Sequence, residues 1–543
     1  MDNSIFNRRT FLAATAAASV VPLRADDSAN PVVKTNKGQL RGIKENGVTV
    51  FKGIPYTGPS DGVNRFKPPT KLEPWSGVRD AIDYGPQAIQ NRDPNSLPGS
   101  SMAATSENCQ LLNIWTPDVN DGKKRPVMFY SHGGGFATGS GGTGKNPAHD
   151  GSALAHNYDV VVVTHNHRLG LMGYLYLGDI LGEEYAASGI TGMLDIVAAL
   201  EWVRDNIAAF GGDPSNVMIW GESGGGAKVS TLLAMPPAHG LFHKASIESG
   251  PGIRMTPSDA ATATTRALLE DLGLNAPQAR QLLEVPVSRL LEFQGKHINA
   301  GRGTVGNFGP VVAGPYLPAH PFDPAAPAIS KNIPLIVGTN KDETIFQSEH
   351  LPLAEATQIF NLNDAGLRER ISKALGDKAS QVDHVLTVYR ENRPKATPTD
   401  LYIAITTGMG MWANAITLTE RKVQQKGAPV FMYMFAYESE VPVAKTINYP
   451  MKSPHAMEIV FKFDHPENSA NAGSRPERFD AARNMSHAWA TFARTGNPSF
   501  DGIPKWPAYT LDTRATMILD AKCKVVNDPF AAERRLWEKI NAG

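Results

Sequence analysis

Six short apolar runs, separated by segments with helical periodicity, constrain the fold of this chain more than any other feature. They are RPVMFYS, DVVVVTH, NVMIWGE, KASIES, IPLIVGTN and APVFMYMFAY, and they begin at residues 125, 159, 216, 244, 333 and 428. Such runs are typical of strands buried on both faces of a mostly parallel sheet. The sequence therefore predicts an α/β fold with a large, mostly parallel central sheet flanked by helices, and functional loops at the carboxyl ends of the strands.

The segments between these runs are expected to pack helices onto the sheet. GMLDIVAALEWVRDNIAAF has apolar residues at helical spacing, and Gly211, Gly212 and Pro214 favour a stop after it. Residues 255–300 and 350–425 are also rich in helical patterns and are expected to be insertions that cap the sheet edge. Because the sequence contains no repeat or low-complexity linker after residue 30, we predict one large domain over residues 26–543.

Two short runs near the start, VVKTNKGQLRGI and GVTVFKGIPY, combine Val, Ile and Thr with turn glycines. This composition predicts a small antiparallel region. We expect it to decorate the main body without joining the central sheet.

The first residues resemble an export signal. Arg8 and Arg9 precede a small apolar run, residues 11–23, that is too short to span a bilayer. Paired arginines before such a run are typical of twin-arginine signals, which direct folded proteins out of the bacterial cytoplasm. We therefore expect residues 1–25 to be a signal peptide, and the mature protein to be periplasmic or secreted, without a membrane anchor. A charged, disordered tail is the alternative.

Charge and cysteine content argue against several classes of function. Lys plus Arg and Asp plus Glu both total 53, so the net charge is zero and provides no bulk field to hold nucleic acid. The two cysteines, Cys109 and Cys523, are too few and too far apart for a disulfide framework or a zinc site. We expect no nucleic-acid partner, no metal and no cofactor.

The stretch GESGGG, residues 221–226, follows the third apolar run and precedes a helical pattern. A strand, then G-x-S-x-G, then a helix is the arrangement of a nucleophile elbow, where a sharp turn exposes the serine hydroxyl above the sheet. Ser223 is therefore the candidate nucleophile. A second match, GPSDG at residues 58–62, lies in a proline-rich loop with no helical pattern behind it, so Ser60 is a weak alternative.

A serine nucleophile needs a general base and donors for its oxyanion. HGGG, residues 132–135, directly follows a strand, where esterases and lipases place the loop whose backbone N–H groups bind the oxyanion. Triad members in such folds follow the chain order Ser, acid, His. The acid candidates are Asp342 and Glu343, and His455 is the first histidine after the sixth run. His487, in a helical stretch, is the alternative base.

Two other motifs suggest different chemistry but lack necessary parts. GSGGTGKN, residues 139–146, is close to a phosphate-binding loop, but Asn146 stands where that loop has its magnesium-binding hydroxyl. The histidines of HNH, residues 165–167, have no third ligand pattern nearby. Neither nucleotide binding nor metal binding is expected.

Together these motifs resemble the type-B carboxylesterase family, which includes the cholinesterases. The resemblance runs from about Val33 to Trp506, and its motifs occur in the family's order: FKGIPYTGP, RFKPP, SENCQLLNIWTP, HGGGFATGS, HNHRLGLMGY, WVRDNIAAFGGDPSNV, GESGGG, GTNKDE, PHAMEIVF and FARTGNP. It implies a single α/β-hydrolase catalytic domain, with helical insertions around an active-site gorge. It also implies Ser223 as nucleophile, Glu343 rather than Asp342 as the acid, and His455 as the base.

The resemblance extends to residues around the triad. It implies oxyanion donors on the N–H groups of three glycines, a second layer of two residues beside the triad, and an apolar pocket with two aromatic residues. These three sets are Gly134, Gly135 and Gly224; Glu222 and Ser249; and Phe136 and Phe346. Arg65 with Glu107, and Arg168 with Asp195, match positions where the family has buried ion pairs.

The sequence departs from the family pattern at three positions. Gly224 stands where the family usually has alanine, which keeps the N–H group but leaves the backbone freer. The partner of the usual SEDC cysteine is missing from YGPQAI, so Cys109 is predicted to be free. Lys228 replaces a small residue just after the elbow, and the sequence offers no reason for it.

The predicted function is hydrolysis of small to medium, hydrophobic or aromatic carboxylic esters through an acyl-enzyme. Amide or carbamate hydrolysis is the first alternative, because it requires the same nucleophile and oxyanion donors. A noncatalytic binding protein is the second, since some members of this superfamily lack the serine. The predicted partner is a small-molecule ester, and the predicted assembly is a monomer or a dimer.

Overall fold

All six apolar runs form neighbouring strands of one sheet. They are β9 (Arg125–Ser131), β10 (Val161–His165), β11 (Gly212–Glu222), β12 (Lys244–Glu248), β15 (Leu335–Asn340) and β16 (Val430–Phe435). This computed structural model describes residues 30–91, 103–142, 147–297, 306–349 and 351–542. The predicted signal peptide and the last four residues of GSGGTGKN lie outside these ranges.

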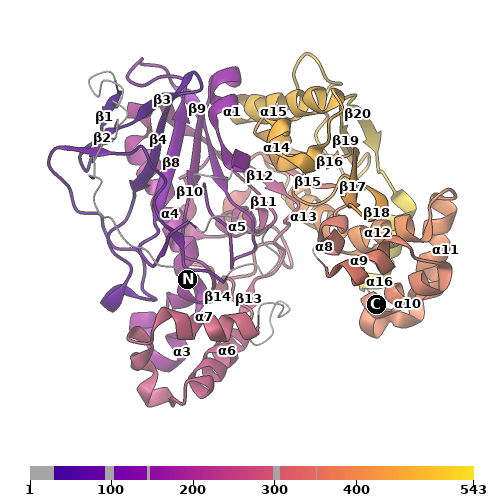
Figure 1. The fold of residues 1–543 in the computed structure, drawn as a ribbon, viewed down its shortest axis with the longest axis horizontal. Helices are drawn as coiled ribbons and strands as arrows, with labels where there is room; N and C mark the ends of the chain where they lie inside the picture. Colours follow the sequence, from indigo (N-terminus) through magenta and orange to yellow (C-terminus); the bar gives the residue numbers. More distant parts are fainter. Residues whose placement is uncertain (1–29, 92–102, 143–146, 298–305, 350, 543) are drawn as a thin grey trace, which may run out of the picture. The chain divides into compact units, whose positions relative to one another are not determined.

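The sheet has 11 strands in the order β20-β19-β16-β15-β12-β11-β9-β10-β8-β4-β3 (Figure 1). The strands from β19 (Ala515–Leu519) to β10 in that order pair in parallel. The strands that flank this parallel run, β20 (Lys524–Asn527) beside β19 and β8 (Leu111–Thr116) beside β10, pair antiparallel. The prediction of a large, mostly parallel sheet is therefore confirmed.

The expectation that both N-terminal runs stand outside this sheet is wrong for the second run. That run forms β4 (Val48–Pro55), which pairs with β8 and with β3 (Ile43–Glu45). β4 joins the sheet because its first four residues are all buried and so have no solvent face. The first run forms β1 (Val32–Lys34) and β2 (Gln39–Arg41), which belong to a separate three-stranded sheet with β5 (Val78–Asp80).

Helices cover both faces of the central sheet, and β9 shows how its side chains serve two cores. Val127 and Phe129 pack into a cluster with residues of α4 (Thr191–Asn206) and α5 (Gly224–Leu232). Met128 and Tyr130 pack into a second cluster with residues of α1 (Ser152–Tyr158) and α15 (Glu477–Thr495). Successive residues of a strand point to opposite faces, which explains the alternation. α4 is the helix predicted from its apolar spacing, and Gly211 follows it with φ +77°.

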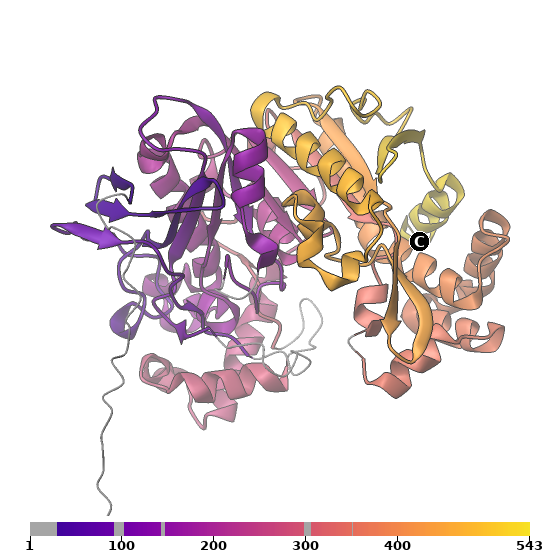
Figure 2. The ribbon, with the colours of Figure 1, turned by 45° about the horizontal axis from the view of Figure 1, so that its top comes forward.

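The two predicted insertions are helical and form separate groups, coloured pink and salmon in Figures 1 and 2. The first contains α6 (Ser258–Asp271) and α7 (Val287–Lys296). The second contains α9 (Leu353–Phe360), α10 (Asp364–Leu375), α11 (Val382–Asn392), α12 (Pro398–Thr407) and α13 (Ala413–Gln424). A five-residue π-helical turn, Gly408–Trp412, joins α12 to α13.

The predicted ion pairs and the free cysteine are confirmed. Arg168 lies 2.7 Å from Asp195, with both side chains almost fully buried, and Arg65 lies 2.5 Å from Glu107. Cys109 is buried and free. Removing one partner of the Arg168 pair would leave an uncompensated buried charge, so a loss of activity there would not indicate a catalytic role.

Two helical stretches, Glu183–Phe210 and Pro398–Gln424, are long and apolar enough to cross a membrane by length and composition. In the first, 83% of the most apolar window is buried inside the protein. Its apolar residues belong to the core between α4 and the sheet. Residues Pro31–Gly543 form one compact unit.

Candidate active site

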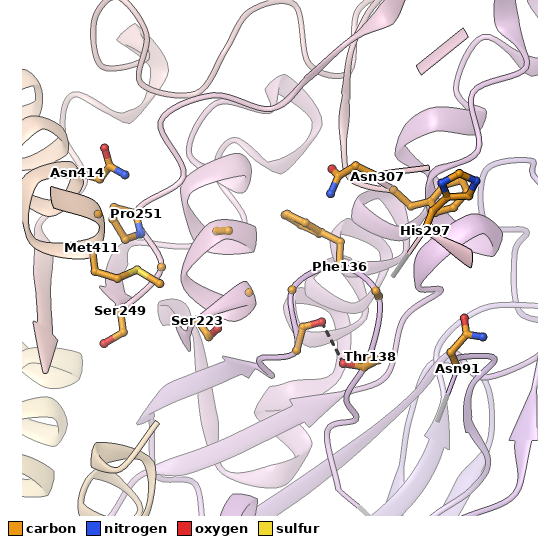
Figure 3. Close-up of a pocket in the computed structure, with 18 of the residues that line it drawn as sticks. Asn91, Phe136, Thr138, Ser223, Ser249, Pro251, His297, Asn307, Met411 and Asn414 are labelled. Carbon is orange, nitrogen blue, oxygen red and sulfur yellow. Dashed lines mark hydrogen bonds between the residues drawn. The ribbon is translucent and has the colours of Figure 1, made fainter. Parts of the chain in front are cut away.

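Ser223 lies on a sharp turn between β11 and α5. Its backbone has φ +56° and ψ −121°, a conformation that L-residues rarely adopt, and its N–H donates to the Glu248 carbonyl at 2.8 Å. The turn requires glycine nearby, since a Cβ on Gly225 would lie 2.0 Å from the Ser131 carbonyl oxygen. The strain is what points the Ser223 side chain into a cavity above the sheet (Figure 3).

Two peptide groups of the HGGG loop are oriented by hydrogen bonds to their carbonyl oxygens. The Gly133 carbonyl accepts from Nδ1 of His132 at 2.9 Å, and the Gly134 carbonyl accepts from the Thr138 N–H at 3.0 Å. The N–H and C=O of a trans peptide point in opposite directions. The N–H groups of Gly134 and Gly135 are therefore directed away from these contacts, and both glycines line the same cavity as Ser223.

Gly224 brings a third N–H to this place, at the start of α5. The Ser223 carbonyl accepts from the Ala227 N–H at 3.1 Å, which turns the Gly224 N–H the other way. A Cβ on Gly224 would lie 2.2 Å from the Gly135 carbonyl oxygen and 2.4 Å from its nitrogen. The oxyanion loop thus approaches the elbow too closely for the alanine usual in the family, and close packing limits the freedom that glycine adds.

His455 is paired with Glu343 and not with Asp342. Nδ1 of His455 lies 2.6 Å from Oε2 of Glu343, whose other oxygen accepts from the Asn340 N–H at 2.7 Å. The Asp342 carboxylate instead lies 3.7 Å from Nζ of Lys341. The two neighbouring acids therefore face different surroundings, and only Glu343 can orient the imidazole.

The second imidazole nitrogen of His455 faces Glu222. Nε2 lies 3.3 Å from Oε1 of Glu222, and no hydrogen bond joins His455 to the Ser223 hydroxyl in the described part of the chain. Such catalytic contacts are often long without substrate and shorten in the complex. Because the Glu343 carboxylate accepts from Nδ1–H, Nε2 of the neutral ring carries the lone pair that a base needs.

Charge and burial have opposite effects on these groups. Burial lowers the pKa of His455, but the carboxylates of Glu222 and Glu343 outweigh it, so the pKa lies above its ordinary value. Burial raises the pKa of Glu222. The balance between these two groups controls how much of the enzyme holds His455 as a neutral base.

Replacing Glu222 with glutamine is expected to move the acid limb of the kcat/KM profile to lower pH. The variant removes an anion that raises the pKa of His455. That pKa, and with it the acid limb, is therefore expected to fall by about one unit. Stopped assays between pH 5 and 11, corrected for spontaneous hydrolysis of the ester, measure the shift, because the pKa of His455 is raised to about 10. An unchanged limb would mean that Glu222 carries no charge in the active form of the enzyme.

The other candidates have structural surroundings. Ser60 is buried, and its hydroxyl donates to the Glu107 carbonyl at 2.6 Å. His487 lies on α15, with its ring stacked on Phe500 at 3.9 Å between centroids. His165 contacts the Ser131 hydroxyl at 3.0 Å, and no group of metal-binding side chains occurs among the described residues.

The cavity at Ser223 has a volume of about 770 Å³. Figure 3 shows Ser223 between two walls. One wall carries Met411, from the π-helical turn, Asn414, from α13, and Ser249. The other carries Phe136, from the oxyanion loop, and His297, just after α7. Residues of both helical insertions therefore line the cavity.

Phe136 and Phe346, the predicted pocket aromatics, have different positions. Phe136 lines the cavity and packs edge-on against Tyr174, with centroids 5.3 Å apart. Phe346 packs edge-on against the His455 imidazole at 5.5 Å, and is not in the cavity wall. Ser249 lines the cavity, and its buried hydroxyl has no hydrogen-bond partner among the described residues.

A serine on a strained strand-to-helix turn, beside three glycine N–H groups and a histidine–glutamate pair, defines a serine hydrolase of the α/β-hydrolase class. The Carboxylesterase family model matches residues 29–537. The chain belongs to this family and is a carboxylic ester hydrolase.

Individual relatives match over nearly their whole length. Para-nitrobenzyl esterase of Bacillus subtilis (strain 168) is 37% identical over 511 residues, which are 93% of this chain and 98% of the relative. Phenmedipham hydrolase of Pseudarthrobacter oxydans is 31% identical over 518 residues, 92% of this chain and 97% of the relative. A solved structure of a carboxylesterase of Geobacillus stearothermophilus is 37% identical in sequence. The match covers 93% of this chain and 99% of the chain in that structure, with a TM-score of 0.77.

Proposed function

We propose that this carboxylesterase hydrolyses small to medium, hydrophobic or aromatic esters through an acyl-enzyme on Ser223. The observation that carries the proposal is the strained Ser223 backbone, which directs the hydroxyl into a cavity beside Gly134, Gly135 and Gly224. Phe136, Phe308 and Met411 give that cavity apolar walls. An apolar lining with a few polar groups is typical of sites for small hydrophobic ligands.

In the proposed mechanism, Nε2 of His455 takes the Ser223 proton as Oγ attacks the ester carbonyl. The negative charge that forms on the carbonyl oxygen accepts hydrogen bonds from the three glycine N–H groups. Glu343 stabilises the imidazolium, which then protonates the leaving alcohol as the C–O bond breaks. Water, activated by His455, attacks the acyl-enzyme in the same way, and the carboxylic acid leaves as Ser223 regains its proton.

The substrate class is supported by one relative and tested by a panel. Para-nitrobenzyl esterase is named for an aromatic ester, and Phe136 gives the cavity at Ser223 an aromatic side chain against which such a group would pack. We expect kcat/KM for para-nitrophenyl butyrate to exceed that for a charged ester of similar size, such as a succinate monoester, by about tenfold or more. Equal values for the two, or a preference for the charged ester, would contradict the apolar pocket.

Carbamate hydrolysis is the second candidate, because one relative is a phenmedipham hydrolase. The same nucleophile and oxyanion donors serve both reactions. A matched ester, carbamate and amide of the same aromatic group separate them. Higher kcat/KM for the ester supports the first proposal, and higher kcat/KM for the carbamate supports the second.

We also propose that residues 1–25 direct export by the twin-arginine route, on the strength of Arg8, Arg9 and the apolar run that follows. Changing both arginines to lysine is expected to leave the protein in the cytoplasm, because the pair is the feature that such a route reads. Fractionation of cells that express each form, with immunoblotting, measures its location. Unchanged export of the lysine form would contradict the route.

A further inference from the structure

Lys228 is completely buried directly beneath the oxyanion loop. It lies on α5, one turn after Gly224, and none of its surface is exposed. Burial lowers the pKa of its amine to about 7. The amine forms no ion pair with any residue that the structure describes. A lysine in such a place is costly, because its charged form has lost its hydration and the Glu222 carboxylate, which favours the charge, offsets only part of that loss.

Lys228 contacts both ends of the loop that carries the oxyanion donors. Its Nζ donates a hydrogen bond to the His132 carbonyl at 2.8 Å, and lies 5.7 Å from the centroid of the Phe136 ring. The second contact is within the range of a cation–π interaction. Gly134 and Gly135 lie between these two anchors, so one side chain connects the loop to α5 before and after the donors.

The hydrogen bond from Lys228 to the His132 carbonyl also affects the orientation of the Gly134 N–H. His132, whose carbonyl Lys228 holds, uses its own Nδ1 to orient the Gly133 carbonyl, and with it the Gly134 N–H. A carbonyl can only accept, so Nδ1 must carry a hydrogen. Burial and the nearby Lys228 lower the pKa of His132, which keeps the ring neutral. The chain of contacts thus runs from α5 through Lys228 and His132 to the peptide group at Gly134.

We propose that Lys228 is a positioning residue, which fixes the oxyanion loop to α5 so that the Gly134 and Gly135 N–H groups stay aligned with the N–H of Gly224. This inference rests on the proposed function, because it assigns Lys228 a task only if those three groups bind the oxyanion. Gly224 and Lys228 lie four residues apart on one helix, and therefore on the same face. The helix that supplies one donor thus also holds the loop that supplies the other two.

Packing alone is a poor explanation for a lysine here. Methionine has a similar length, fills irregular apolar space well and carries no charge to desolvate. If Lys228 served only to fill space, methionine would serve better. The retained amine is explained if its hydrogen bond to the His132 carbonyl matters for the reaction.

The test compares Lys228→Met with Lys422→Met. Lys422 is also buried and also donates to backbone carbonyls, those of Ser330 and Lys331, but lies on α13 away from the loop.

For Lys228→Met we expect kcat on para-nitrophenyl butyrate to fall about tenfold or more, with KM within about twofold of wild type, since oxyanion donors act mainly in the transition state. The rate constant for inactivation by a fluorophosphonate should fall in the same proportion. The melting temperature should stay equal or rise, because a buried charge has been removed. For Lys422→Met we expect wild-type kcat.

Two results would overturn the inference. One is wild-type kcat and wild-type inactivation rate in Lys228→Met. The other is a fall in kcat that comes with a lower melting temperature and a proportionate rise in KM, as general loosening would produce. If Lys228→Met does not fold, Lys228→Gln replaces it, because its amide is one atom shorter and leaves the same carbonyl out of reach. Wild-type enzyme that resists the fluorophosphonate would refute the proposed function itself, which distinguishes that failure from a failure at Lys228.

Discussion

Replacing Ser223 with alanine is expected to lower kcat/KM for an ester by about 10⁵-fold or more, while the protein folds normally. Serine and histidine of a triad act as a unit, and loss of either member removes nearly all of the covalent pathway. The elbow should survive, because alanine retains the backbone and removes a hydroxyl that has no partner among the described residues. Initial rates on para-nitrophenyl butyrate, with circular dichroism on the same sample, measure both effects.

The chain offers a matched control for this variant in Ser60, the central residue of the other G-x-S-x-G match. Ser60→Ala removes a buried hydrogen bond to the Glu107 carbonyl and should cost some stability. Its activity per folded molecule should equal that of the wild type. If Ser223→Ala keeps the wild-type rate in a pure sample, the nucleophile has been assigned to the wrong residue.

Replacing His455 with alanine is expected to lower kcat/KM by about 10⁴- to 10⁶-fold, because Ser223 then has no base to take its proton. The loss should be smaller above pH 9, where hydroxide begins to replace the base. The variant leaves Glu343 buried next to an empty space, so its melting temperature should fall as well. A pH series of kcat/KM, with a melting curve at each pH, separates the catalytic loss from the loss of stability.

His487→Ala is the control for this second variant. His487 stacks on Phe500 and lies on α15, so its loss should change stability more than rate. Equal losses of rate in the two variants would mean that the imidazole of His455 has no special role. A normal rate in His455→Ala would exclude it as the base.

Much of the central sheet could be predicted because its strands are buried on both faces. A continuous apolar run such as that of β10 is typical of a strand buried on both faces of a parallel sheet. The threonine and glycine of β4 are typical of a small antiparallel region outside the sheet, although its first four residues are buried like those of a sheet strand. Alternation and composition alone do not reveal whether a short strand pairs with its neighbour in sequence or with a distant strand.

Site residues were predictable where local geometry determines them. The elbow at Ser223 and the loop at Gly134 are short motifs, each tied to the end of a strand. The choice between Asp342 and Glu343 was different, since the two acids are adjacent and only the position of His455, 112 residues away, distinguishes them. It depended on the resemblance to the family, as spacing along the chain gave no preference.

Residues from the helical insertions could not be predicted from the sequence. Met411 reaches the cavity from a π-helical turn, and no local pattern marks that turn. Lys228 had no explanation from sequence, because its partner is a backbone carbonyl 96 residues away. Both positions depend on long-range packing, which amino-acid patterns within one segment do not encode.

The most direct test of the account is the intact mass of the purified enzyme after treatment with a fluorophosphonate, followed by peptide mapping of any adduct. The reagent needs an activated serine together with oxyanion donors, so it reports on the assembled site. We expect one adduct per chain, on Ser223, and no adduct in Ser223→Ala. An adduct on another serine, or none on folded wild-type protein, would contradict it.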